Sequence, residues 1–333
     1  MTALWGSMNG RGKILLVLLV LALLAAPMVA SRYLLSVLTL ILYFVYVGQA
    51  WNLMMGYAGQ LSLGHALYVG LGGYVAAILW VHYGIGPWLS IVPAIAIAMA
   101  FGAAIGWLAF RFGIEGVYFA LLTIAFAEFT RIGFDHLAIA GGAGGLFIPY
   151  EEQRLGEWWN LRGNQLFFYY LAFILAAAGV LITALLSRAR LGFQWLAVRE
   201  DEMAARALGI DAFRAKMKAV LISSGMTAVG GVFYAFYNNT LFPAQMFEMS
   251  RSIELILAPI VGGLGTIFGP VVGAFILTPL GEILIMLTDW LGINLPGVKA
   301  VFYGLTLMII ISLVPTGVWP RIAQSLDLKK HGP

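Results

Sequence analysis

Long apolar runs follow one another along almost the whole chain, and they constrain its fold more than any other feature of the sequence. A bilayer core is about 30 Å thick, so a helix needs about 20 apolar residues to cross it. Backbone polar groups in lipid must be satisfied within the segment, which a helix achieves alone. The sequence therefore predicts an all-α polytopic membrane protein with about ten membrane segments. These segments are 13–31, 33–54, 62–82, 87–110, 115–134, 166–187, 218–238, 252–264, 267–290 and 298–315.

Composition agrees with this class and excludes several others. The chain is 62% hydrophobic and 10% charged, whereas about a quarter of the residues in soluble domains are charged. We therefore expect one transmembrane domain over residues 1–333, in contact with membrane lipid. The net charge of +4 does not indicate a nucleic-acid partner, because no soluble basic face accompanies it. The absence of cysteine excludes disulfides, thiolate metal sites and a cysteine nucleophile, and no metal site is expected.

Two of the segments allow a second interpretation. The first apolar run follows Arg11 and Lys13 and ends in small residues, a pattern that also fits a cleavable signal peptide. A further run begins at Tyr33 almost without a break, which favours a retained first span. The segment 252–264 is too short to cross comfortably, so we expect a short or re-entrant helix there.

Basic residues gather on one side of the predicted bundle. About ten crossings would place both termini, the turn at Arg111 and the segment 188–218 on the same side. The opposite side includes the loop 135–165, in which three glutamates outnumber two arginines. Because Lys and Arg are enriched in cytoplasmic loops, we expect both termini to be cytoplasmic. The glycine-rich stretch 141–145 of the outer loop fits either a flexible turn or a docking surface for an external partner.

The segment 188–218, which we call the knob, is the one part of the chain whose composition is typical of a water-exposed segment. It holds seven Arg or Lys and four Asp or Glu residues between two apolar runs. Ala204, Ala205 and Leu208 form a small apolar ridge on a helix. Gly209 can end that helix in a left-handed conformation. A solvated positive-inside loop would need neither feature, so we interpret the knob as a rigid projection on which a soluble motor can act. Its expected coupling residues are Arg199, Glu200, Asp201, Glu202, Ala204, Ala205 and Gly209.

Polar residues inside the predicted segments are candidates for a transport path, because each is costly in lipid. Glu128 and Arg131 are three residues apart near the outer end of the fifth segment, so they can pair on one helical face. His65 lies one turn into the third segment, beside Gln60 and Ser62. The Glu128–Arg131 pair fits a structural ion pair at the membrane interface as well as a role in lining the outer mouth of the path. His65 fits helix packing as well as a contact with an amino-acid headgroup. The glycines around His65 can break the helix and expose backbone groups to a cavity.

Motifs for other functions are missing. The chain has no G-x-x-x-x-G-K-[ST] loop for nucleotide phosphates, so any ATP must be hydrolysed by another protein. It has no HExxH or G-x-S-x-G motif, and its four histidines are scattered, which argues against an intramembrane enzyme. An ion-coupled secondary transporter would be expected to show functional carboxylates and two matching half-repeats. No convincing repeat is present.

Four stretches carry a resemblance to a known family. In order and at family-like spacing, they resemble the branched-chain amino acid ABC transporter permeases of the LivM-like branch, over most of residues 50–290. The Ala-Ala-x-x-x-Gly spacing in the knob also looks like the cytoplasmic loop of ABC importer permeases, although Met203 stands where that loop often has an acidic residue. The four stretches are Gly-Tyr-Ala-Gly-Gln-Leu-Ser-Leu-Gly-His at 56–65, Gly-Val-Tyr-Phe-Ala-Leu-Leu-Thr at 116–123, Ala-Val-Arg-Glu-Asp-Glu at 197–202 and Gly-Gly-Leu-Gly-Thr at 262–266.

The resemblance implies a transport subunit rather than an enzyme. Such a permease carries branched-chain or other hydrophobic amino acids inward across the bacterial cytoplasmic (inner) membrane. It works with a second homologous permease, two cytoplasmic ATPase subunits and an external, periplasmic solute-binding protein. ATP is bound by the ATPase subunits, so the chain itself needs no cofactor. Urea, short amides and aromatic acids are the alternative substrates within the family.

Overall fold

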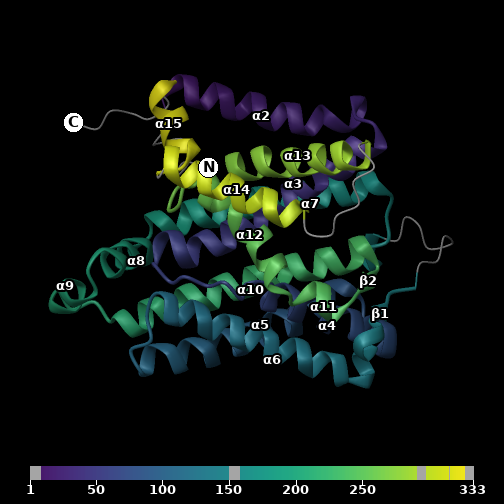
Figure 1. The fold of residues 1–333 in the computed structure, drawn as a ribbon, viewed down its shortest axis with the longest axis horizontal. Helices are drawn as coiled ribbons and strands as arrows, with labels where there is room; N and C mark the ends of the chain where they lie inside the picture. Colours follow the sequence, from purple (N-terminus) through teal and green to yellow (C-terminus); the bar gives the residue numbers. More distant parts are fainter. Residues whose placement is uncertain (1–8, 150–157, 291–297, 315, 327–333) are drawn as a thin grey trace. The chain divides into compact units, whose positions relative to one another are not determined.

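The computed structural model describes residues 9–149, 158–290, 298–314 and 316–326, and most of them are helical (Figure 1). The long or regular helices are α2 Gly10–Val29, α3 Arg32–Asn52, α4 Ala66–Tyr83, α5 Pro87–Arg111, α6 Val117–His136, α7 Gln165–Arg188, α8 Arg190–Glu200, α9 Glu202–Ala207, α10 Ala212–Asn238, α11 Pro243–Met246, α12 Met249–Gly262, α13 Gly269–Trp290, α14 Val298–Leu313 and α15 Val318–Ser325. A π-helix, η1, covers Leu53–Tyr57, and the 3₁₀ turns η2, η3 and η5 cover Ala138–Ala140, Gly142–Gly144 and Trp158–Asn160. Strands β1 Leu146–Phe147 and β2 Thr240–Leu241 pair antiparallel.

Among the described residues, eight helices are long and apolar enough to cross a membrane. This confirms the all-α polytopic class. Helices α12 and α14 have 14 and 16 residues, fewer than the roughly 20 that a full span needs. Helix α12 covers most of the segment that the sequence predicted to be short, 252–264. The total of ten crossings and the cytoplasmic placement of both termini stay predictions.

The chain folds as two compact units, each built from separated stretches of sequence. The first contains residues 1–49, 165–189 and 257–333, and the second contains 50–164 and 190–256. The prediction of a single domain over 1–333 was made from composition, which carries no information about such a division.

In the first unit, small residues allow helices to pack closely. A Cβ atom added at Gly273 of α13 would lie 1.8 Å from the carbonyl oxygen of Ala258 of α12, so only glycine fits there. Gly179 of α7 likewise faces the ring of Tyr46 of α3 at 3.0 Å. In lipid the hydrophobic effect does not drive helices together, because the surrounding lipid is as apolar as their side chains. Helices therefore associate through such close packing contacts. These two glycines therefore serve helix packing.

In the second unit, α4 and α10 form the centre. A Cβ atom at Gly72 of α4 would lie 2.2 Å from the carbonyl oxygen of Ala228, and one at Gly231 of α10 would lie 2.1 Å from that of Val69. The two backbones therefore approach each other with no side chain between them. Helix α9 lies at one end of α10, and the β1–β2 pair lies at the other end (Figure 1). The second unit thus places the knob and the outer loop at opposite ends of its central helix.

Two boundaries differ from those predicted. The third segment was predicted to start at 62, but α4 begins at Ala66, so His65 precedes the helix and does not lie one turn inside it. The apolar residues Leu61 and Leu63 concealed this break. The seventh segment was predicted to start at 218, but α10 begins at Ala212 and takes in the end of the knob.

Candidate functional site

Residues 58–65, which we call the interrupted segment, separate η1 from α4 without forming a helix. Gly59 has φ +71°, a left-handed conformation that glycine adopts without strain. The segment is nevertheless buried: Gln60 is 8% exposed, and Ser62 and His65 are 0% exposed. Non-helical backbone at membrane depth is tolerated only where protein buries it or where it lines a cavity. Because π-helices such as η1 also concentrate at functional sites, this segment is the first candidate for the transport path.

Neighbouring helices satisfy the backbone of the interrupted segment. The N–H groups of Leu63 and Gly64 both donate to the hydroxyl oxygen of Thr123 on α6, each at 3.1 Å. The N–H of Ala66 donates to Ser252 Oγ of α12 at 2.9 Å. A Cβ atom at Gly64 would lie 2.0 Å from the carbonyl oxygen of Thr123, so this end of the segment lies directly against α6. The segment is therefore held in one defined conformation.

Two polar side-chain atoms of the interrupted segment lack a partner. His65 Nε2 lies 2.8 Å from Thr227 Oγ1, and that hydroxyl donates its proton to the carbonyl oxygen of Ser223. The imidazole must therefore donate through Nε2, which leaves Nδ1 as an acceptor. Among the described residues, neither His65 Nδ1 nor Ser62 Oγ has a hydrogen-bond partner. Gln60, the third predicted residue here, donates to the carbonyl oxygen of Ala58 at 3.0 Å.

A small pocket lies beside the interrupted segment. About 20 Å³ of its interior is open to a water-sized molecule, which is enough for one water. Its wall is mostly apolar, with Glu128 and Ser252 as the polar side chains. An apolar wall with a few polar groups is typical of small-molecule sites. The lining residues are Leu63, Gly64, Ile124, Ala127, Glu128, Phe247, Met249 and Ser252.

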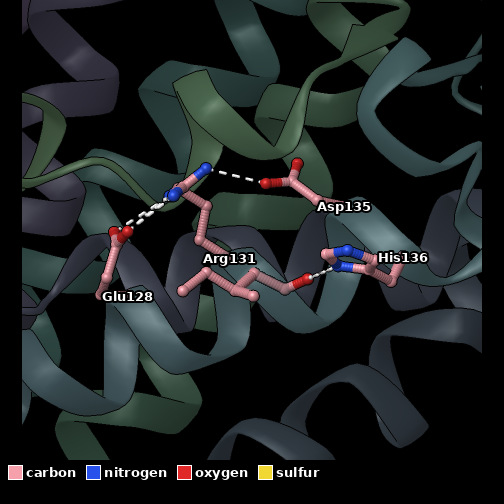
Figure 2. Close-up of polar contacts among 5 residues, drawn as sticks. Glu128, Arg131, Asp135 and His136 are labelled. Carbon is pink, nitrogen blue, oxygen red and sulfur yellow. Dashed lines mark hydrogen bonds and ion pairs between the residues drawn. The ribbon is translucent and has the colours of Figure 1, made fainter.

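Next to this pocket, α6 carries a cluster of charged side chains (Figure 2). Arg131 pairs with Glu128 at 2.6 Å, as the three-residue spacing predicted, and with Asp135 at 2.8 Å. Asp135 was not among the predicted residues, although its four-residue spacing from Arg131 is a helical pairing distance. His136 makes no contact with these charged groups in Figure 2, and its Nδ1 atom lies 2.8 Å from the carbonyl oxygen of Ile132. The carboxylate of Glu128 is therefore partly neutralised, and its side chain remains 51% exposed.

A second ion pair was also missed. On α12, Arg251 pairs with Glu254 at 2.9 Å, and the guanidinium lies 4.3 Å from the centre of the Tyr234 ring. The two side chains are 14% and 19% exposed. Ser252, which lies between them in sequence, lines the pocket. Among the described residues, no group of three or more His, Asp or Glu side chains is placed to hold a metal ion.

The knob is a compact helical structure. Trp195 of α8 is fully buried, and its indole N–H donates to the carbonyl oxygen of Ala215 on α10 at 2.8 Å. Asp201 caps α9 by accepting from the N–H of Ala204, and Asp211 caps α10 by accepting from the N–H of Arg214. Gly209 ends the short helix with φ +83°, as predicted. Local capping rules thus account for each turn of the knob.

Some of the residues predicted to contact a motor also stabilise the knob itself. Glu202 contacts the Nζ atom of Lys216, which is itself buried and also pairs with Glu115 at 3.1 Å. Ala205 is 2% exposed, so the predicted apolar ridge is split between the inside and the outside. Arg199 contacts both Glu200 and the carbonyl oxygen of Gly56.

The exposed apolar surface of the knob belongs to other residues. Met203 and Leu208 are 73% and 82% exposed, and Ala204 and Gly209 are exposed beside them. Large apolar side chains on an otherwise charged projection make these residues the candidates for a contact with another protein. The signal was present in the sequence as two large apolar residues flanking the Ala-Ala pair.

Known proteins resemble this chain in sequence over most of its length. Residues 33–312 match the family described as the branched-chain amino acid transport system / permease component. The chain is 28% identical over 340 residues to the high-affinity branched-chain amino acid transport system permease protein LivM of Escherichia coli K12, covering 96% of this chain and 77% of that protein. It is also 28% identical over 348 residues to the LivM protein of Salmonella typhimurium LT2, covering 98% and 79%. No solved structure matches the chain.

The family match covers well over half of the chain, including every segment that forms the pocket and the knob. The relatives are transport permeases, in agreement with the helices long enough to cross a membrane. The chain therefore belongs to the family of branched-chain amino acid ABC transporter permeases, as a LivM-like multi-pass membrane protein.

Proposed function

We propose that this chain is the transmembrane subunit of an ABC importer that carries branched-chain or similar hydrophobic amino acids into the cell. The observation that carries the proposal is the knob, a capped and internally anchored projection with exposed Met203 and Leu208. A transporter that works alone needs no such surface. The chain also lacks a phosphate-binding loop, so ATP is hydrolysed on two separate subunits that contact the knob.

The remaining partners follow from the same proposal. A second, homologous permease completes the transport path, and an external solute-binding protein delivers the substrate at the end of the second unit that carries the β1–β2 pair. Arg162 stabilises this end, because its guanidinium donates to Asn239 and to the carbonyl oxygen of Pro149. In this orientation the knob is cytoplasmic, and the chain lies in the bacterial inner membrane with both termini inside.

The pocket suits a zwitterion with an apolar side chain. Ile124, Phe247 and Met249 supply apolar wall, and the carboxylate of Glu128 can accept hydrogen bonds from an ammonium group. The pocket has room for only about one water molecule. In the conformation described here it is therefore too small for an amino acid, and transport requires it to widen.

The described intramembrane carboxylates argue against an ion-coupled transporter. Glu128 pairs with Arg131, Glu254 pairs with Arg251, and Glu282 accepts from the hydroxyl of Tyr33 at 3.0 Å. A proton-coupled or sodium-coupled mechanism needs an acid that can change its charge or bind the ion during the cycle. Each of these three acids already has a partner.

Uptake of labelled leucine tests the proposal. The host cells should lack their own leucine uptake system and should carry this chain with its neighbouring subunits. Isoleucine, valine and urea serve as unlabelled competitors. We expect leucine uptake that requires this chain and is inhibited by isoleucine and valine. Uptake of urea instead of leucine would contradict the assigned substrate, and uptake that persists without the ATPase subunits would contradict the ABC mechanism.

A further inference from the structure

We propose that Arg199 links the knob to the substrate pocket through the interrupted segment, so that displacement of the knob moves the pocket wall at Leu63 and Gly64. The proposal rests on the proposed function, because it explains how an ATPase that contacts the knob could widen the small pocket. It assigns Arg199 as a positioning residue and not as a substrate ligand.

Arg199 is tightly engaged with the inner end of the interrupted segment. Its Nη1 atom donates to the carbonyl oxygen of Gly56, the last glycine of η1. A Cβ atom at Gly59 would lie 2.8 Å from Cγ of Arg199, so the arginine stem lies directly on the backbone of this turn. The other side of the guanidinium contacts Glu200 of the knob. Arg199 therefore joins the end of α8 to η1 by a hydrogen bond, and to the beginning of the interrupted segment by packing on Gly59.

The interrupted segment extends from the knob to the middle of α10. Its far end is His65, which contacts Thr227, and Thr227 lies 227 − 212 = 15 residues from the start of that helix. At a rise of about 1.5 Å per residue, this contact is about 22 Å from the knob end of α10. Between its ends, the N–H of Gln60 donates to the carbonyl oxygen of Met54 at 2.9 Å, and the indole N–H of Trp51 donates to the carbonyl oxygen of Ser62 at 2.8 Å. The segment is thus fixed by hydrogen bonds along its length.

The far end of the segment forms part of the pocket. Leu63 and Gly64 line it, and their N–H groups are fixed on Thr123. Gly64 lies against the backbone of Thr123, where an added Cβ atom would be 2.0 Å from the carbonyl oxygen. Close-packed interiors transmit displacement because they contain few voids that could absorb it. A shift of the inner end therefore changes the position of Leu63 and Gly64 relative to Glu128.

The other anchors of the knob join it to elements outside the interrupted segment. Lys216 joins Glu202 to Glu115, which lies in the turn before α6, and Trp195 joins α8 to the first turn of α10. These contacts hold the knob in shape. Within the described residues, Arg199 is the knob side chain with a hydrogen bond to the turn 56–59.

The absence of cysteine from the chain allows a direct test with a single reporter thiol. Leu63→Cys places the thiol in the pocket wall, and its rate of reaction with a maleimide is measured in the full complex in nanodiscs, without nucleotide and with ATP and vanadate. The backgrounds are the otherwise unsubstituted chain, Arg199→Ala, Arg199→Lys and the control Arg214→Ala. Arg214 is a suitable control because it lies in the same segment, is 79% exposed and pairs with Asp211. Equal recovery of assembled complex establishes that each variant folds.

We expect nucleotide to change the labelling rate of the reporter by about fivefold or more in the unsubstituted and Arg214→Ala backgrounds. Arg199→Ala should abolish this change while ATP hydrolysis continues, and Arg199→Lys should restore part of it, because lysine can still donate to Gly56. An unchanged nucleotide response in Arg199→Ala would overturn the inference and leave the proposed function standing. No response even in the unsubstituted chain would overturn both.

Discussion

Replacing Glu202 with Gln should loosen the knob and leave the membrane helices folded. The Lys216 ammonium is nearly buried, with 6% of its side chain exposed, and it contacts both Glu202 and Glu115. Removing one partner of a fully buried ion pair costs about 3–5 kcal/mol. The cost is smaller here, because Glu202 is 18% exposed and Glu115 still pairs with Lys216 at 3.1 Å. We expect about 1–2 kcal/mol, confined to the knob.

Hydrogen exchange of the amides of α9 measures this cost directly. A loss of about 1–2 kcal/mol should raise the opening equilibrium of α9 about 5–30-fold. The matched control is Arg206→Gln, which removes the other cation that contacts Glu202 but is 57% exposed. An exposed pair contributes about 0–1 kcal/mol, so exchange in the control should rise by less than about fivefold. Equal exchange in Glu202→Gln and the unsubstituted chain would refute the anchoring role of Lys216.

Three further predictions concern the knob and the helix packing. Acid should loosen α9: burial raises the pKa of Glu202, but Lys216 outweighs it and holds that pKa below the ordinary 4.5. The stabilisation of α9 by the ionised Glu202 is therefore present above pH 4.5 and is lost as the pH falls through the lower pKa of the folded state. Glu202→Gln should remove this pH dependence of the hydrogen exchange of α9. Leu208→Ser, at an 82% exposed site, should reduce co-purification of the ATPase subunits with no change in membrane insertion; normal co-purification would contradict docking there. Gly231→Ala should destabilise the protein by about 1–3 kcal/mol, because its Cβ would lie 2.1 Å from a carbonyl oxygen of α4. Gly133→Ala, which has open space around it, is the control in thermal unfolding, and equal unfolding temperatures would disprove the close packing.

Features that depend on neighbouring residues were predictable from the sequence. The left-handed Gly209 and the cap at Asp211 follow from rules that act within one helical turn. The pairing of Glu128 with Arg131 follows from helical spacing in the same way. Asp135 obeys the same rule and could have been found.

Features that depend on distant residues were not predictable. The bond from His65 to Thr227 joins residues 162 positions apart, and that from Lys216 to Glu115 joins residues 101 apart. Hydrophobicity also gave the wrong start for α4. The interrupted segment contains leucines and so looks as apolar as a membrane helix, but it is non-helical and is buried by protein. No pattern of neighbouring residues in the sequence predicts the pocket or the inward orientation of Ala205.

The most direct test of the account is leucine transport in proteoliposomes that contain the purified complex. ATP is supplied only on the side of the knob, and the solute-binding protein with labelled leucine only on the opposite side. The account predicts leucine accumulation on the knob side. This accumulation should require ATP and should stop when ATP is replaced by a non-hydrolysable analogue. Accumulation driven by an ion gradient without ATP, or transport away from the knob side, would contradict it.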